Sequence, residues 1–126
     1  MSFGRPALRL LALGMLCGVL SVPARGQGLP LALLSLTSPV LRGHEAHVVV
    51  RTAPHVPCML LVQYRRGGAT SDLALPQRSD DAGRVAWTWR VDPKATPGRW
   101  PLLVHCTKEF KGNVEQGRLE TTYEIR

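Results

Sequence analysis

Residues 84–91 alternate strictly between two kinds of side chain, and this alternation constrains the fold more than any other feature. In an extended strand, successive side chains point to opposite faces. One face would carry Val85, Trp87, Trp89 and Val91, and the other would carry Arg84, Ala86, Thr88 and Arg90. Because the two tryptophans are in line with valines and opposite arginines, we expect both in the core. An exposed platform for stacking sugars is the alternative.

Other short stretches have strand character and are bounded by turn residues. They cover residues 31–37, 44–52, 58–64, 99–106 and 117–125, and residues 73–75 are a candidate short edge strand. Ten prolines and twelve glycines in 126 residues interrupt the chain too often for long helices. A chain of this length fits one domain. The spacing of the strands therefore predicts an all-β fold, an antiparallel sandwich or barrel of six to seven strands.

A register for residues 58–64 and 99–106 follows from their apolar faces. If the two strands pair antiparallel with Cys58 facing Cys106, the same face carries three further pairs: Leu60 with Val104, Val62 with Leu102, and Tyr64 with Trp100. A slip of one residue would turn these side chains to the other face. Tyr64 and Trp100 thus join the expected core aromatics. Pro101 lacks the N–H that a central strand uses, so we expect regular pairing to begin just after it.

The two facing cysteines should form a disulfide in an oxidising compartment. The alternative is a pair of reduced, buried thiols. The disulfide would close the loop from Cys58 to Cys106. Closing a loop of this length stabilises the folded state by roughly 4 kcal/mol, because it lowers the chain entropy of the unfolded state. That is a large part of the ~5–15 kcal/mol by which a small domain is stable.

The opening of the chain has the order of a secretory signal peptide: basic, then apolar, then helix-breaking and small. Arg5 and Arg9 precede an apolar run over residues 10–20, and Ser-Val-Pro-Ala follows at 21–24. We expect cleavage after residue 24, or alternatively after residue 26. Residues 25–126 would then form a single domain outside the cytoplasm, either secreted, at the cell surface or in the periplasm.

Two alternatives to a cleaved signal are a membrane anchor and a lipid anchor. The apolar run is shorter than the ~20 residues that span a bilayer, so we expect no membrane span. Lipid attachment at Cys17 would need a small residue before it, and Leu16 stands there. Cys17 also lies inside the apolar run, so we expect it to be removed with the signal.

Two blocks of the chain resemble a recurring element of bacterial surface Ig-like modules. They are residues 80–91, Asp-Asp-Ala-Gly-Arg-Val-Ala-Trp-Thr-Trp-Arg-Val, and residues 96–106, Thr-Pro-Gly-Arg-Trp-Pro-Leu-Leu-Val-His-Cys. They contain Trp-Thr-Trp and Gly-x-Trp-Pro elements. In those modules a first Cys follows a Thr-Ala-Pro turn and precedes a strand that ends in Tyr and a basic residue. Thr52-Ala53-Pro54, Cys58 and Tyr64-Arg65 match that layout.

The resemblance covers about residues 35–106 and implies an Ig-like β-sandwich outside the cytoplasm. It implies a non-catalytic module with a structural or binding and adhesion role. Three features differ from the pattern. His55 stands where a Gly is expected in the turn before the first Cys, and the hairpin at 67–75 has another sequence. We also expect the module to stand alone, whereas modules of this kind often occur beside other domains.

Few residues suggest a catalytic or metal-binding site. His44-Glu45-Ala46-His47 differs from the helical zinc signature, because its histidines are three apart in a predicted strand and point to opposite faces. Asp80 and Asp81 are candidate calcium ligands, but an Asp-rich turn that caps its own backbone is commoner. No paired-carboxylate, phosphate-loop or Gly-x-Ser-x-Gly pattern is present. We therefore expect no catalytic residue, no metal site, no cofactor and no enzymatic activity.

The chain is basic, with a formal net charge of +7. Without Arg5 and Arg9, the 14 remaining Lys and Arg residues still exceed the 9 Asp and Glu residues by five. Six basic residues fall on predicted turns or outward faces: Arg65, Arg66, Arg84, Arg90, Lys94 and Arg99. Such a surface attracts wall polymers, acidic glycans or extracellular nucleic acid, while an ordinary solvated surface is the plain alternative.

The partner is the least constrained property. No exposed aromatic residues are interleaved with the basic ones to stack bases, so we expect no specific nucleic-acid binding. We expect a monomer whose partner is a protein or an envelope polymer. Binding of anionic polymers or glycans, and a role as accessory or inhibitor of a secreted enzyme, are alternatives to a general adhesion role.

Overall fold

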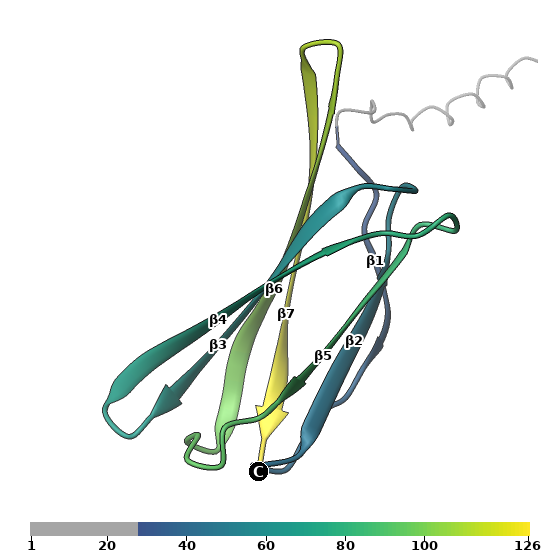
Figure 1. Ribbon diagram of the computed structural model, residues 1–126. Coiled ribbons are helices and arrows are strands. Elements are labelled where there is room, and N and C mark those ends of the chain that lie inside the picture. The colour runs from purple at the N-terminus through teal and green to yellow at the C-terminus, as the bar shows by residue number, and fades with distance from the viewer. Residues whose placement is uncertain (1–27) are drawn as a thin grey trace, which may run out of the picture.

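Seven β-strands arranged in two facing sheets make up the described part of the chain (Figure 1). A computed structural model describes residues 28–126, so the predicted signal peptide and Cys17 lie outside the described residues. The strands are β1 (Ala32–Leu36), β2 (Glu45–Arg51), β3 (Pro57–Arg66), β4 (Ala69–Arg78), β5 (Arg84–Arg90), β6 (Gly98–Phe110) and β7 (Asn113–Ile125). Every ladder between them is antiparallel, which confirms the predicted β-sandwich.

The two sheets have the strand orders β1-β2-β5 and β4-β3-β6-β7. In constant-type Ig domains the fourth strand lies in the sheet of the first, second and fifth strands. Here β4 pairs along its whole length with β3 instead. The arrangement is therefore an Ig-like sandwich in which the fourth strand has joined the opposite sheet.

The side chains of β5 alternate as the sequence predicts. Trp87 and Trp89 are 4 % and 6 % exposed and lie in the core, while Ala86, Thr88 and Arg90, which alternate with them, are exposed. Trp89 packs edge-on against Tyr123 of β7, with ring centroids 6.0 Å apart. The indole N–H of Trp87 donates to the carbonyl of Leu75 on β4 at 2.8 Å. Both rings thus join the two sheets, and the buried N–H has the partner it needs.

The predicted register between residues 58–64 and 99–106 is confirmed over three of its four pairs. Cys58 lies opposite Cys106, and the ladder continues to Val62 opposite Leu102. The cysteines form a disulfide between neighbouring strands of one sheet. The β3–β6 ladder ends next to Pro101, whose missing N–H cannot extend it.

The fourth predicted pair, Tyr64 with Trp100, does not form, because β3 turns away from β6 beyond this point. The carbonyl of Arg65 accepts instead from the N–H of Thr96 at 2.7 Å, and Arg66 bridges to Ala95. Tyr64 and Trp100 are half-buried and pack against the edge of the core. They are therefore less enclosed than Trp87 and Trp89.

Three strands are clearly longer than the sequence predicts: β4, β6 and β7. The candidate edge strand at 73–75 is part of the ten-residue β4. Strand β6 continues past Cys106 to Phe110, and β7 begins at Asn113, before the predicted start at residue 117. The extended parts form a hairpin that projects beyond the rest of the sandwich (Figure 1). Near the tip of this hairpin, Phe110 and Val114 are 62 % and 51 % exposed.

Candidate functional site

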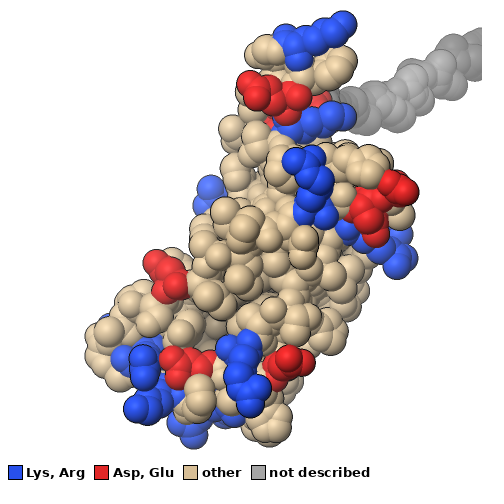
Figure 2. Space-filling view, viewed as in Figure 1, with Lys and Arg blue, Asp and Glu red and all other residues tan. Residues whose placement is uncertain are grey.

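One end of the sandwich carries clearly more basic than acidic residues. Strands β3, β5 and β7 end there, and β2, β4 and β6 begin there. Seven exposed basic residues belong to this end, which we call the basic end: Arg42, Arg65, Arg66, Arg90, Lys94, Arg99 and Arg126. In Figure 2, viewed as in Figure 1, blue side chains with some red ones gather at the bottom, where the C-terminus lies; further blue and red side chains lie at the top, and the middle of this face carries few charges.

Backbone hydrogen bonds tie the segments of the basic end together. Gly43 donates to the carbonyl of Val91 at 2.8 Å, and Val91 donates to that of His44 at 2.9 Å. Arg42 donates to the carbonyl of Arg126 at 3.1 Å. Together with the Thr96–Arg65 bond, these contacts join the β1–β2 loop, the β5–β6 loop, the end of β3 and the C-terminus. The basic side chains are thus attached to one connected framework.

Carboxylates neutralise two of the seven basic residues. Arg66 Nε lies 3.4 Å from Asp92 Oδ2, and Arg126 Nε lies 3.0 Å from Glu124 Oε2. Within residues 28–126, the other five basic-end residues form no ion pair: Arg42, Arg65, Arg90, Lys94 and Arg99. Exposed cations without a carboxylate partner create a positive potential that attracts an anion.

The structure brings together four of the five arginines that the sequence singles out. Arg65, Arg66, Arg90 and Arg99 belong to the basic end, whereas Arg84 lies at the other end of β5, opposite Arg51 of β2. Sequence reasoning missed Arg42 and Arg126. No local pattern marks them, since they reach the basic end through contacts between residues far apart in sequence.

A hollow of about 280 Å³ opens where β3 and β6 separate, within the basic end. Two half-buried rings, one guanidinium and several smaller side chains line it: Gln63, Tyr64, Arg65, Thr70, Trp100 and Pro101. A second hollow of about 510 Å³ shares Gln63 and Pro101 with the first and continues along β6 and β7. Where β3 diverges from β6, the two hollows thus form a shallow groove beside the basic-end residues that form no ion pair.

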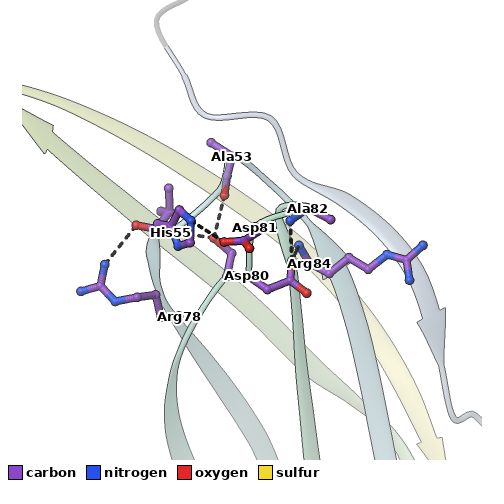
Figure 3. Close-up of polar contacts among 9 residues, drawn as sticks. Ala53, His55, Arg78, Asp80, Asp81, Ala82 and Arg84 are labelled. Atoms are coloured by element: carbon purple, nitrogen blue, oxygen red, sulfur yellow. Dashed lines mark hydrogen bonds and ion pairs between the residues drawn. The ribbon is translucent and has the colours of Figure 1, made fainter.

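The opposite end carries a polar cluster that stabilises a turn (Figure 3). Asp80 Oδ1 accepts from the N–H groups of Ala82 at 2.9 Å and Arg84 at 2.8 Å. The bond from the Arg84 N–H is the largest cause that lowers the pKa of Asp80 below its usual value. Asp80 therefore caps its own turn, which is the commoner role for an Asp in this setting.

His55 belongs to the same cluster and has an unusual backbone conformation. Its φ is +58°, a left-handed conformation that favours Gly, which is the residue expected there. His55 Nε2 lies 2.8 Å from Asp81 Oδ1, and the carbonyl of His55 accepts from Arg78 at 3.0 Å. These contacts join His55 to the β4–β5 turn and to the end of β4.

The histidines do not converge. His44 precedes β2 and His47 lies within it, where its ring contacts the hydroxyl of Thr37. In the part of the chain that the structure describes, no three His, Cys, Asp or Glu side chains are grouped so as to hold a metal ion. Nor does any helix within residues 28–126 have the length and apolar character to cross a membrane.

The chain was compared with protein-family models and with curated proteins. Neither comparison found a match, so the resemblance to bacterial surface Ig-like modules stays a prediction.

Proposed function

We propose that this chain is a monomeric, non-catalytic binding module of the cell exterior that attaches to anionic polymers through its basic end. The observation that carries the proposal is the excess of positive charge at the basic end, where seven basic residues outnumber four acidic ones, Glu45, Asp72, Asp92 and Glu124. A polyanion gains from such a surface because it can meet several charges at once, each worth little alone.

A position outside the cytoplasm is supported by the disulfide and by the predicted signal peptide. Structural disulfides form and persist in oxidising compartments and are rare in the cytosol. The Cys58–Cys106 bond is of this structural kind, since Cys58 is 5 % exposed and Cys106 is fully buried.

A non-catalytic role is supported by the titratable groups. Strongly perturbed pKa values tend to cluster at catalytic sites. In residues 28–126, Asp80 has a lowered pKa because it caps a turn, and Tyr123 has a raised pKa because it is buried in the core. The fold accounts for both, and neither group lies in the hollow between β3 and β6.

Retention on a heparin column, eluted with a salt gradient, tests the proposal with two matched double variants. Arg90→Gln/Lys94→Gln removes two charges from the basic end. Arg51→Gln/Arg84→Gln removes two charges from the opposite end of the same sheet. All four residues are exposed, so both variants should retain the fold.

We expect the first variant to elute at clearly lower salt than the parent protein and the second to elute close to it. Electrostatic attachment of this kind falls steeply as salt rises. An equal loss of retention in both variants would mean that only the overall charge matters, and it would refute the basic end as the attachment site. Absence of retention by the parent protein would refute polyanion binding altogether.

A further inference from the structure

We propose that the hollow between β3 and β6 holds one acidic sugar unit of the bound polymer, an inference that rests on the proposed function. The hollow combines two aromatic side chains, hydrogen-bonding side chains and a guanidinium without an ion pair within about 280 Å³. That volume is near the lower limit of small-molecule sites, which suits a single ring rather than a large ligand.

The two aromatic rings are fixed before any ligand arrives. The indole N–H of Trp100 donates to the carbonyl of Thr96 at 2.8 Å, and the ring packs against Gly98. The hydroxyl of Tyr64 lies 3.4 Å from Asp92 Oδ2. Rings held in this way lose little conformational entropy on binding. Their exposed parts offer an apolar surface to the C–H face of a sugar ring.

The remaining lining residues fit the polar parts of such a ring. Gln63 and Thr70 offer an amide and a hydroxyl to sugar hydroxyl groups. Arg65 lines the same hollow and has no ion pair within the described residues, so its guanidinium is available to a carboxylate or sulfate. A bare phosphate would use only the arginine, whereas an acidic sugar uses all three kinds of group.

The neighbouring hollow indicates a chain rather than a single sugar. It shares Gln63 and Pro101 with the first hollow and adds Thr121 and Thr122 of β7. Arg118 in its wall is already paired with Glu120, so this part offers hydrogen bonds without a net charge. A linear acidic oligosaccharide can therefore run from the Arg65 hollow along β6, and it should bind more tightly than one sugar unit.

Fluorine NMR of protein labelled with 5-fluorotryptophan tests this placement directly. The three tryptophans give three signals, and the signal missing from Trp100→Phe identifies Trp100. We expect tetragalacturonate to shift the Trp100 signal and to leave those of Trp87 and Trp89, both buried in the core, unchanged. Neutral maltotetraose and tripolyphosphate at equal ionic strength should leave the Trp100 signal unchanged.

Two substitutions of Arg to Gln supply the matched control. Arg65→Gln should weaken tetragalacturonate binding about tenfold, because a charge-assisted hydrogen bond is lost. Arg84→Gln, at the other end of the sandwich, should leave the affinity unchanged. Both exposed positions should tolerate the change, and the fluorine signals of the parent protein need no substitution to be informative.

The outcomes separate the two proposals. Tetragalacturonate that binds without moving the Trp100 signal would overturn the sugar site while leaving polyanion attachment by the basic end intact. Equal shifts with maltotetraose, or with a thymidine tetranucleotide, would overturn the assignment to an acidic sugar. Loss of heparin retention in both double variants alike would instead remove the proposed function on which this inference rests.

Discussion

Gly83, in the turn between β4 and β5, lies close to the backbone of Thr52, and replacing it by Ala gives a sharp test of the packing. Gly83 has a φ of +81°, a conformation that costs other residues free energy. Its N–H donates to the carbonyl of Asp80 at 3.0 Å, and its carbonyl accepts from the N–H of Thr52 at 2.7 Å. A Cβ at this position would overlap the carbonyl oxygen of Thr52.

The expected loss follows from these contacts. The left-handed conformation costs an alanine about 1 kcal/mol. The overlap with Thr52 forces the turn to move, and each of the two backbone hydrogen bonds lost with it is worth about 1 kcal/mol. We therefore expect Gly83→Ala to lower the free energy of unfolding by about 3 kcal/mol. Gly67→Ala is the matched control, because Gly67 has a φ of +63° but open space around a Cβ, so it should cost only about 1 kcal/mol.

Equilibrium unfolding in urea measures both losses, with tryptophan fluorescence as the probe, since Trp87 and Trp89 leave the core on unfolding. The difference between the two variants isolates the contact with Thr52 from the cost of the backbone conformation. If the two losses agree within about 0.5 kcal/mol, the spread typical of surface substitutions, the close approach of the turn to Thr52 contributes nothing and the reasoning is wrong.

The remaining predictions concern the disulfide and the core. Protein recovered from outside the cytoplasm should show no free thiol at Cys58 or Cys106 in mass-spectrometric labelling, and reduction should lower the free energy of unfolding by roughly 4 kcal/mol. Free thiols at both positions would contradict the disulfide. Burial raises the pKa of Tyr123, with a smaller contribution from Tyr64, so its phenol stays protonated in the folded state and stability should fall as the pH rises above 10.0, the ordinary value. At neutral pH, Tyr123→Phe should lower the free energy of unfolding by about 1 kcal/mol, because the hydrogen bond from Tyr123 to the Gln63 carbonyl is lost. Between pH 9 and 11, the free energy of unfolding of this variant should decline less than that of the parent protein. An equal decline in both proteins would argue against Tyr123 as the titrating group.

The sequence predicts those strands that have one buried and one solvated face. In β5, the alternation around Trp87 and Trp89 fixes which side chains enter the core. In β3 and β6, the faces can be matched only in the register that brings Cys58 to Cys106. Such strands carry their orientation in their own residues, because a slip of one residue would expose the apolar set.

Strands that are exposed on both faces cannot be predicted in this way, because their side chains show no buried and solvated alternation. Strand β4 is fully or half exposed at every position, so only Leu73 and Leu75 marked it, and its length comes from pairing with β3. The projecting part of the β6–β7 hairpin likewise buries no side chain that would reveal it. The basic end depends on loop contacts between distant segments, which no local pattern encodes.

The disulfide has a consequence for the order in which the chain assembles. Its cysteines are 48 residues apart, and the intervening segment contains all of β4 and all of β5, one strand from each sheet. In a reduced chain, β3 finds β6 only by closing this long loop, and such distant pairings slow folding. Once oxidised, the two strands are neighbours before the sheets exist. In an oxidised chain, the bond thus turns a distant pairing into a local one.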